Sequence, residues 1–337
     1  MSFTVTLAGR DESFPVEMGT PILDAALEAG IAFPYSCRAG NCSSCKSHLL
    51  AGEIEMMDYS EFALSASERA EGIILACRAV PWSDCTVEVL DAEELVLHPG
   101  RQLACRVRAI ERATHDIVIL RLAIESGGPM EYEPGQYARV TFPGLPARDF
   151  SMATPHRPDE LEFHLRCVPG GVVSGYVAER AQLGDVVRVS GPFGTAYLRE
   201  RHAGPVILAG GGTGLAPVLA MLDALVASGV ERRIDVYVGA RAERDLYAHD
   251  RLAAAERAGV TVHRVLSEPD AVSPHRTGFL ADALRADALD LAGVKVYLAG
   301  PPVMVDTCIA ALESRGVARR DMHADAFYAA PPAAATA

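Results

Sequence analysis

Apolar and polar residues alternate at the start of the chain and then recur with helical spacing. Residues Phe3–Leu7 alternate as in a strand with one buried face. Further on, Thr20 is expected to cap a helix that begins with Pro21 and ends before Gly30. The N-terminal pattern therefore predicts a strand followed by a short helix.

Residues 101–200 show the pattern of short strands and turns. Apolar runs predict strands at Val118–Leu122, Tyr137–Phe142 and Leu161–Arg166. Pro-Gly pairs at 134–135 and 169–170 mark turns, and Val173–Arg180 has helical spacing. Several short strands at this spacing predict a small antiparallel β-barrel.

From residue 203 onward, strand and helix patterns alternate. The expected strands are Val206–Ala209, Ile234–Val238, Thr261–Val265 and Val294–Leu298. The expected helices are Leu215–Ser228, ended by Gly229, and Val303–Arg315, ended by Gly316. Such alternation predicts a parallel sheet with helices on both faces, an α/β nucleotide-binding domain. The last seven residues, Pro-Pro-Ala-Ala-Ala-Thr-Ala, are expected to form a loose tail.

Charge is distributed unevenly over the 337 residues, whose net charge is −13. Residues 1–99 hold 16 acidic and 5 basic residues, so this segment carries most of the negative charge. A step of this size indicates a separate N-terminal domain that ends between Asp91 and Arg101. We expect three domains, at residues 1–95, 101–200 and 203–330. The acidic balance argues against nucleic-acid binding.

An uncharged run at residues 205–222 has the minimum length of a membrane span. Its clustered glycines fit a strand, a turn and a helix better, so no membrane partner is expected. The N-terminus lacks the basic and apolar segments of an export signal, which predicts a cytoplasmic protein. No segment has the pattern of an obligate interface, so a monomer is expected.

Four of the eight cysteines form one group, at Cys37, Cys42, Cys45 and Cys77. Their spacing, Cys-x4-Cys-x2-Cys followed by a distant Cys, is typical of plant-type [2Fe–2S] sites. A structural zinc site is an alternative, although zinc more usually takes two Cys-x2-Cys pairs. A buried structural set is another alternative. The remaining cysteines are expected to be ordinary buried residues: Cys85, Cys105, Cys167 and Cys308.

Residues 34–45, together with 73–77, resemble the cluster-binding loop of plant-type ferredoxins. The resemblance implies a β-grasp-like domain in which the four grouped cysteines are iron ligands.

A second set of motifs lies in the middle segment. Arg148 can hold a phosphate through two hydrogen bonds, and Phe150 offers a face for stacking. Gly170 and Gly171 would let backbone N–H groups approach a pyrophosphate at the start of a helix. Each motif alone is also compatible with a plain strand or turn. The candidate cofactor-binding residues of this segment are Arg148, Phe150, Ser151, Met152, Arg166, Val168, Gly170, Gly171, Val172 and Ser174.

In order and spacing, these motifs resemble the ferredoxin–NADP reductase superfamily, whose flavin motif is Arg-x-Tyr-Ser. Phe150 stands where that family has Tyr, which removes a hydroxyl but keeps the ring. The resemblance implies that Arg148 holds FAD phosphate and that Phe150 and Ser151 meet the isoalloxazine. It also implies that Ser174 and the glycines before it bind pyrophosphate.

A glycine-rich loop follows the first strand of the last segment and opens a helix. This is the setting of a phosphate-binding loop, with Gly211, Gly212, Thr213 and Gly214 as candidates. The loop departs from Gly-x-Gly-x-x-Gly, and the next strand does not end in an acidic residue. A structural turn is the alternative, but the form resembles the NAD(P) domain of the same superfamily.

Two further groups of residues bear on nicotinamide binding. Arg241 and Arg244 can pair a 2′-phosphate, or they are solvated charges, which leaves NADH and NADPH both open. In the superfamily, one loop lies beside the nicotinamide. In this chain that loop begins at Ala299 and continues through Gly300 and Pro301. That loop usually begins with Cys, so Ala299 removes any role for sulfur there.

The chain ends in Ala324-Asp325-Ala326-Phe327-Tyr328. In the superfamily a C-terminal acidic residue and an aromatic residue lie against the flavin, and Asp325 and Phe327 occupy those positions. The resemblance implies catalytic roles for Asp325, Phe327 and Ser151, with Phe327 also contacting the cofactor. The alternative is that Phe327 only packs against the last strand.

Three redox signatures in one chain suggest an electron path. NAD(P)H gives a hydride, a [2Fe–2S] cluster takes single electrons, and FAD can do both, so FAD must lie between them. Over residues 3–328 the chain resembles reductase components of bacterial aromatic-ring oxygenases, of the naphthalene-dioxygenase type. That implies a Rieske-type ferredoxin or a terminal oxygenase as electron acceptor. Alternatives are a reductase for a monooxygenase or a deoxysugar dehydratase, a diaphorase with a small-molecule acceptor, and a redox sensor.

Overall fold

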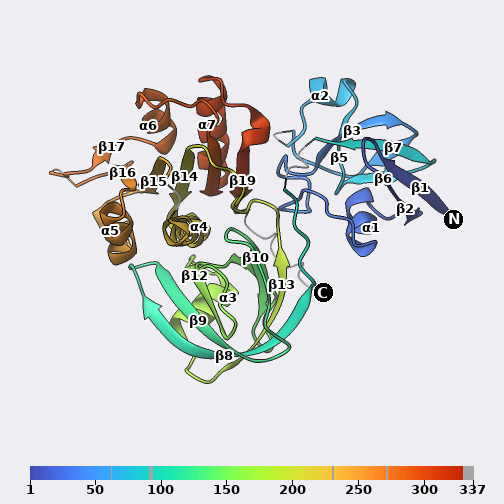
Figure 1. The fold of residues 1–337 in the computed structure, drawn as a ribbon. Helices are drawn as coiled ribbons and strands as arrows, with labels where there is room; N and C mark the ends of the chain where they lie inside the picture. The colour runs from blue at the N-terminus through green and yellow to red at the C-terminus, as the bar shows by residue number, and fades with distance from the viewer. Residues whose placement is uncertain (62, 91–93, 230, 271, 329–337) are drawn as a thin grey trace.

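Each of the three sequence segments forms its own β-sheet in the computed structural model, and the three units pack together (Figure 1). The structure describes residues 1–61, 63–90, 94–229, 231–270 and 272–328. The N-terminal unit (blue) and the C-terminal unit (orange to red) lie side by side above the middle unit (green) in Figure 1. The expected C-terminal tail and part of the expected first linker lie outside the described residues.

The N-terminal unit is a mixed sheet in the order β2-β1-β7-β3-β5, in which β1 and β7 are parallel. Its strands are β1 (Ser2–Leu7), β2 (Glu12–Glu17), β3 (Lys46–Ala51), β5 (Ile73–Leu75) and β7 (Cys85–Val89). A small second sheet pairs β4 (Ile54–Met56) with β6 (Ala79–Pro81), and the helices are α1 (Ile22–Glu28) and α2 (Ala66–Ala70). Alternation in β1 buries Val5 and Leu7, as the pattern predicted.

The start of α1 differs from the sequence prediction. Pro21 is the N-cap residue, with an extended backbone, and no side chain caps the helix. Thr20 therefore does not cap it, because the helix begins one residue later than expected. Gly30 lies just past the end with φ +73°, a left-handed conformation that glycine adopts without strain.

The middle unit is an antiparallel sheet in the order β11-β10-β13-β8-β9-β12. Its elements are β8 (Arg101–Arg112), β9 (Ile117–Ser126), β10 (Tyr137–Thr141), β11 (Arg148–Ser151), β12 (Glu160–Arg166), α3 (Val172–Glu179) and β13 (Val186–Phe193). An isolated bridge between Met152 and Phe163 joins the two outer strands, so the sheet closes nearly into a barrel. The predicted barrel and helix α3 are confirmed, but strands β8, β11 and β13 were not predicted from the sequence.

The C-terminal unit is a fully parallel sheet in the order β17-β16-β15-β14-β18-β19. Its strands are β14 (Val206–Gly211), β15 (Ile234–Ala240), β16 (Thr261–Leu266), β17 (Arg276–Thr277), β18 (Lys295–Gly300) and β19 (Met322–Ala326). Its α-helices are α4 (Leu215–Ser228), α5 (His249–Arg257), α6 (Leu280–Ala286) and α7 (Pro302–Glu313). Short 3₁₀ turns lie at η1 (Gly212–Gly214), η2 (Glu243–Asp245) and η3 (Arg319–Asp321).

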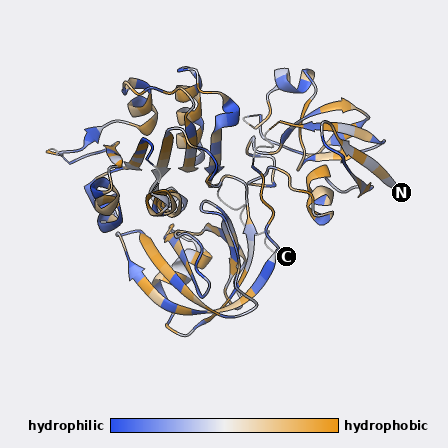
Figure 2. Cartoon of the chain, viewed as in Figure 1, coloured by the Kyte–Doolittle hydropathy of each residue, from blue (hydrophilic) through white to orange (hydrophobic). Residues whose placement is uncertain are grey.

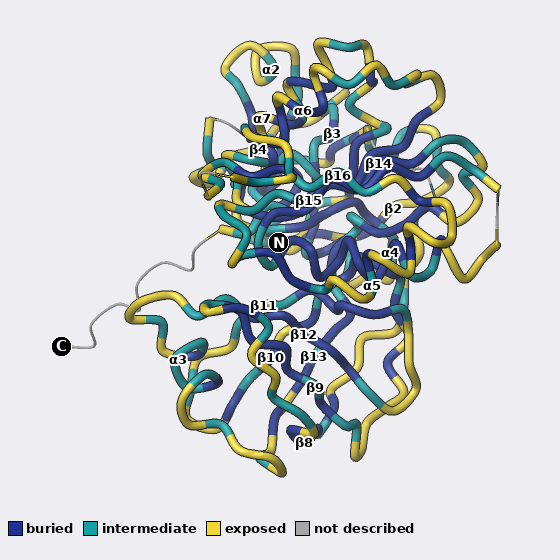
Figure 3. The backbone as a smooth tube through the Cα atoms, turned by 90° about the vertical axis from the view of Figure 1, so that its left-hand side faces the viewer, coloured by how far each residue is buried: buried dark blue, intermediate teal, exposed yellow. Residues whose placement is uncertain are grey.

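Helices cover both faces of this parallel sheet, as predicted. One apolar cluster joins α4 and α5 to the sheet, and a separate cluster joins α6 and α7 to its other face. Figure 2 shows hydrophobic residues concentrated on the strands and helices, and Figure 3 shows β14 as a buried strand. The uncharged run at 205–222 forms a strand, a turn and the start of α4. Within the described residues, no helix combines the length and apolarity needed to span a membrane.

Candidate cofactor and electron-transfer site

The four grouped cysteines come together in the N-terminal unit as two pairs. Cys37 shares a hydrogen bond with Cys42, and Cys45 shares one with Cys77. Three of them lie on the loop between α1 and β3, and Cys77 lies between β5 and β6. Two irons that each need two thiolates match this pairing of donors.

The backbone of the loop turns toward the sulfurs. The N–H groups of Ala39 and Asn41 donate to Cys37 Sγ at 3.4 and 3.3 Å. A hydrogen bond from Cys42 lowers the pKa of Cys37 to about 6, and these two amides act in the same direction against burial. The same pairing raises the pKa of Cys42 and of Cys45, so the shifts reflect four thiols held close together. Four gathered sulfurs with backbone N–H groups turned toward them fit a [2Fe–2S] cluster.

Glycine is required at one position of this loop. Gly40 has φ +73°, and a Cβ there would come within 2.9 Å of both Arg78 and Tyr59. The loop can therefore fold tightly over the thiols only with glycine at this point. Outside the loop, Cys85, Cys105 and Cys308 are buried as expected, whereas Cys167 is only half-buried because it follows the end of β12.

A cavity of about 640 Å³ lies where the three units meet. The cluster loop contributes Ser36, Cys37, Ala39 and Asn41 to its lining. The barrel and the C-terminal unit contribute the predicted residues Arg148, Phe150, Ser151, Arg166, Thr213, Asp325 and Phe327. The size suits a flavin, and the candidate flavin motif and a candidate iron-ligating cysteine border the same space.

Strand β11 carries the flavin motif along one wall of this cavity. Ser151 pairs with Tyr137 across the β10–β11 ladder, and its hydroxyl donates to Asp325 at 3.4 Å. Arg148 is half-buried, with one guanidinium nitrogen on the carbonyl of Ala147 at 2.8 Å. Met152 is fully buried in the barrel core, so its side chain does not reach the cavity.

The predicted pyrophosphate residues gather at the start of helix α3, apart from the cavity lining. Gly171 is the N-cap residue, and Ser174 accepts a hydrogen bond from the N–H of Val168 at 3.3 Å. A Cβ on Gly171 would lie 2.4 Å from the Ser174 hydroxyl, so only glycine fits there. Gly170, with φ +74°, precedes it, and Val172 is exposed at the first helical position. An exposed helix start with free N–H groups suits an anion.

Asp325 is the buried carboxyl at the centre of the cavity wall. The Ser36 hydroxyl donates to it at 2.8 Å, and the Ser151 hydroxyl donates from the opposite unit. Burial raises the pKa of Asp325 to about 6, although these hydrogen bonds oppose the shift. Phe327 follows β19, donates its N–H to Gly300 and lines the cavity, so it does not only pack against the strand.

The glycine-rich loop forms the wall of a second cavity, of about 180 Å³. Gly211, Gly212, Arg166, Arg241 and Pro301 line it. A Cβ on Gly214 would lie 2.0 Å from the carbonyl oxygen of Ala299, so the loop can pack against the end of β18 only with glycine there. Gly300, with φ +139°, faces Gly211 in the same contact.

The two candidate phosphate-binding arginines lie in different settings. Arg241 forms ion pairs with Asp116 at 3.5 Å and Asp245 at 3.4 Å. Arg244 is exposed and lines neither cavity. Asp116 lies between β8 and β9, far from Arg241 in sequence, so this ion pair could not be predicted from sequence patterns.

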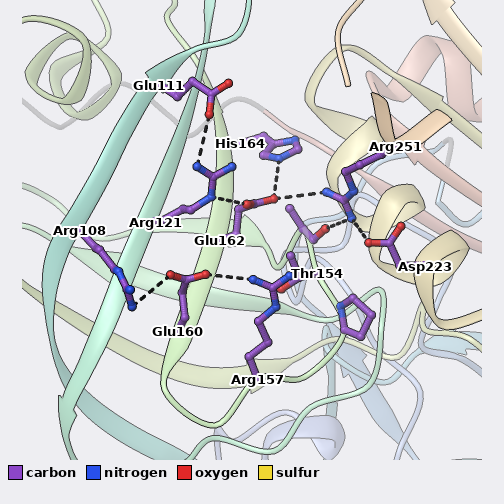
Figure 4. Close-up of polar contacts among 12 residues, drawn as sticks. Arg108, Glu111, Arg121, Thr154, Arg157, Glu160, Glu162, His164, Asp223 and Arg251 are labelled. Atoms are coloured by element: carbon purple, nitrogen blue, oxygen red, sulfur yellow. Dashed lines mark hydrogen bonds and ion pairs between the residues drawn. The ribbon is translucent and has the colours of Figure 1, made fainter. Parts of the chain in front are cut away.

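A charged network that the sequence did not reveal joins the barrel to the C-terminal unit (Figure 4). Glu162 on β12 pairs with Arg121 at 2.7 Å and with Arg251 of α5 at 3.3 Å. Burial acts to raise the pKa of Glu162, but the hydrogen bond from His164 and the two guanidinium groups lower it to about 2. His164 in turn contacts the Tyr247 hydroxyl at 3.0 Å and borders the flavin-sized cavity.

Three family profiles match the chain in the order of its units. They are described as a 2Fe-2S iron-sulfur cluster binding domain at residues 5–81, an oxidoreductase FAD-binding domain at 104–197 and an oxidoreductase NAD-binding domain at 208–309. The chain therefore has domains for the three cofactors expected from the sequence: a [2Fe–2S] cluster, FAD and a nicotinamide nucleotide.

Relatives with known roles match nearly the whole chain. The ferredoxin–NAD(P)⁺ reductase component of a naphthalene 1,2-dioxygenase system from Pseudomonas putida is 39% identical over 316 residues, 93% of this chain and 95% of the relative. The reductase component of propane 2-monooxygenase from Rhodococcus jostii is 37% identical, covering 91% of this chain and 86% of the relative. Among solved structures, an Amycolatopsis cytochrome P450 reductase superposes with a TM-score of 0.77 at 34% identity, covering 96% of this chain and 98% of that one.

A ferredoxin reductase of carbazole 1,9a-dioxygenase also superposes, with a TM-score of 0.70 at 28% identity, over 97% of this chain and 99% of that one. Dioxygenase, monooxygenase and P450 systems are thus all represented among its relatives. The chain belongs to the family of ferredoxin–NAD(P)⁺ reductases that serve as the electron-transfer components of oxygenase systems.

Proposed function

We propose that this protein supplies electrons to a Rieske-type ferredoxin, or directly to a terminal oxygenase, for the hydroxylation of an aromatic compound. The observation that carries the electron path is the cavity of about 640 Å³, which Cys37, Ser151 and Asp325 line together. A flavin held there would lie beside both the cluster loop and the nucleotide loop. The relatives with dioxygenase names support the choice of acceptor.

The residues of the chain divide the work between the cofactors. Arg148 and the start of α3 would hold the FAD phosphates, and Phe150, Ser151 and Phe327 would border its ring. Gly211, Gly212, Thr213 and Pro301 would receive the nicotinamide nucleotide. Bound FAD supplies the exchange between two-electron and one-electron chemistry. On this proposal the protein has three functional domains, at residues 1–95, 101–200 and 203–330. It would act as a monomer in the cytoplasm.

The acceptor is expected to dock on the acidic N-terminal domain. Residues 1–99 hold 16 acidic and only 5 basic residues, and this excess of negative charge would attract a basic protein surface weakly and reversibly. Electron transfer to the true acceptor should therefore slow as the salt concentration rises. A rate that is flat between low and high ionic strength would show that the acidic residues serve only solubility.

We infer further that NADH is the preferred donor. Arg241 is the one predicted 2′-phosphate ligand that lines the nucleotide cavity, and it already pairs with Asp245 and with Asp116, which it shares with Arg166. A 2′-phosphate would have to compete with Asp116 and Asp245 for this guanidinium and would be repelled by both. NADH, which lacks that phosphate, meets no such repulsion.

An anaerobic titration of the purified protein with NADH, followed by visible absorption, tests the path. Bleaching of both flavin and iron–sulfur bands is expected. Bleaching of the flavin alone would show that the cluster is not connected and would favour a diaphorase with a small-molecule acceptor. Steady reduction of cytochrome c that is lost in Cys77→Ser separates a protein-directed reductase from that alternative.

A further inference from the structure

Ser36 links the cluster loop to the other two units. It directly precedes the iron-ligating Cys37, and it is buried, with 4% of its surface exposed. Its hydroxyl donates to Asp325 at 2.8 Å, and its carbonyl accepts from the Tyr137 hydroxyl at 2.9 Å. One residue of the ferredoxin unit is therefore held at the same time by the barrel and by the end of β19.

The bond to Asp325 leads directly to the flavin motif. The second carboxyl oxygen of Asp325 accepts from Ser151, so the two serine hydroxyls share one carboxyl group. Ser151 belongs to the strand that borders the cavity, and Ser36 borders it from the opposite side. The sequence of hydrogen bonds from Ser151 through Asp325 to Ser36 thus ends one residue from a cluster ligand.

Other contacts hold the loop without reaching the flavin motif. Tyr35 and Thr195 exchange backbone and hydroxyl hydrogen bonds at 2.8–2.9 Å, and the Tyr328 hydroxyl donates to the carbonyl of Asn41. These bonds anchor the loop on either side of Ser36. Because these bonds do not involve the Ser36 hydroxyl, the units should stay docked when it is lost. The resulting shift should be confined to the loop around Ser36.

We propose that the Ser36 hydroxyl is a positioning group for electron transfer between the flavin and the cluster. Its bond to Asp325 fixes the Cys37 side of the loop against the flavin cavity. The inference rests on the electron path proposed above. Electron transfer weakens steeply with distance, and a local displacement of the loop would slow it without altering hydride transfer.

The electron balance of the reaction separates the two steps. NADH gives up two electrons and a proton as a hydride to FAD and leaves as NAD⁺. The reduced flavin returns the electrons singly, each time reducing one ferric ion of the cluster to ferrous, and the acceptor protein reoxidises the cluster between transfers. One proton leaves to solvent, so NADH and two oxidised acceptors give NAD⁺, H⁺ and two reduced acceptors. The proposal assigns Ser36 to the second step, through the position of the cluster loop, and the flavin phase of the test reports any effect on the first step through the shared Asp325.

The test compares Ser36→Ala with Ser36→Thr, which keeps the hydroxyl, and with Ser43→Ala. Ser43 is the matched control, because its hydroxyl donates at 3.2 Å to Ala63 inside the ferredoxin unit. Anaerobic stopped-flow mixing with NADH resolves flavin bleaching from cluster bleaching. Iron content and a redox titration of the cluster provide readouts that do not depend on turnover.

In Ser36→Ala we expect cluster reduction to slow by about tenfold, with the flavin phase and the cluster potential unchanged. Ser36→Thr should restore the rate, and Ser43→Ala should leave it at the parent value. The proposal is overturned if Ser36→Ala reduces the cluster at the parent rate, if the cluster potential falls enough to explain the slower rate, or if Ser43→Ala is equally slow. A parent protein whose cluster NADH never reduces would refute the electron path itself.

Discussion

The barrel meets its two neighbours through interfaces of different chemistry. On the ferredoxin side, hydroxyl groups of Tyr137 and Thr195 donate to backbone carbonyls of Ser36 and Tyr35. The same loop also donates from Ser36 to Asp325, which belongs to the C-terminal unit. On the nucleotide side, the buried carboxylate of Glu162 pairs with the partly exposed guanidinium groups of Arg121 and Arg251. The first interface consists of separable hydrogen bonds, whereas the second depends on every charge keeping its partner.

This difference fits the two transfers that occur at these interfaces. Hydride transfer needs the nicotinamide and the flavin in contact, and a charged network penalises any opening that would strip a partner from a buried charge. Electron transfer tolerates a gap, so a few directed hydrogen bonds suffice to place the cluster loop. Substitutions on the two sides should therefore fail in different ways.

The largest effect is expected from Cys45→Ser on the ferredoxin side. Cys45 is a buried member of one thiol pair, and its substitution would remove one of the four candidate iron ligands. Cytochrome c reduction should fall to background, while NADH-dependent ferricyanide reduction continues through the flavin. Steady-state assays with both acceptors measure this, and equal loss of both activities would contradict the independence of the two interfaces.

The next effect is expected from Glu162→Ala on the nucleotide side. The change removes the buried carboxylate that Arg121 and Arg251 share. Arg121 keeps Glu111 and Arg251 keeps Asp223, and both guanidinium groups are partly exposed, so the free energy of unfolding should fall by about 2 kcal/mol. Urea denaturation measures it, with Glu111→Ala, an exposed partner of the same Arg121, as the control. Similar losses for the two variants would show that burial of the network does not matter.

The same network predicts a dependence of stability on pH. The pKa of Glu162 is lowered to about 2 in the folded protein, below its usual value. Its contribution is therefore fully present above the unfolded-state pKa of about 4.3 and is lost as the pH falls toward 2. In Glu162→Gln the unfolding free energy should fall less steeply over that range, and parallel curves would contradict the assignment.

The contribution of Asp325 to stability should depend on pH in the opposite direction from that of Glu162. Its pKa is raised to about 6, so ionisation costs stability in the folded protein as the pH rises from about 4 through 6. Asp325→Asn keeps an oxygen that can accept from Ser36 but removes the buried charge. Its unfolding free energy should exceed that of the parent by about 1–2 kcal/mol at pH 8 and converge with it below pH 4. A difference that stays constant with pH would place the stabilisation elsewhere.

The sequence predicted the parts whose signals are local. The cysteine spacing, the Arg148–Ser151 motif and the glycine loop each occupy a short stretch, and residues of each line the two cavities. The contacts that join the units could not be predicted in this way. Ser36 and Asp325 are separated by 289 positions, and neither residue type signals a partner.

The missed strands have a similar explanation. Strand β8 alternates buried and exposed residues among several arginines, so its apolar signal is diluted. Strand β13 contains a Gly-Pro pair just before its last residue, and both residue types are uncommon inside strands. At Thr20 the sequence predicted a feature that the structure lacks. Threonine is a common cap residue, but the helix begins one residue later and Pro21 is its N-cap.

The smallest effect concerns the choice of nicotinamide nucleotide. Asp245→Asn removes one of the carboxylates that neutralise Arg241, while keeping an oxygen to accept the N–H of Ala242. Because Arg241 is half-exposed and solvent screens the pair, the ratio of kcat/KM for NADPH to that for NADH should rise only about two- to fivefold. Arg241→Ala should lower the same ratio, since it removes the cation and leaves both carboxylates. Steady-state kinetics with the two nucleotides measure this. If Asp245→Asn left the ratio unchanged, the carboxylates would not select against the 2′-phosphate, and the nucleotide side would discriminate by shape alone.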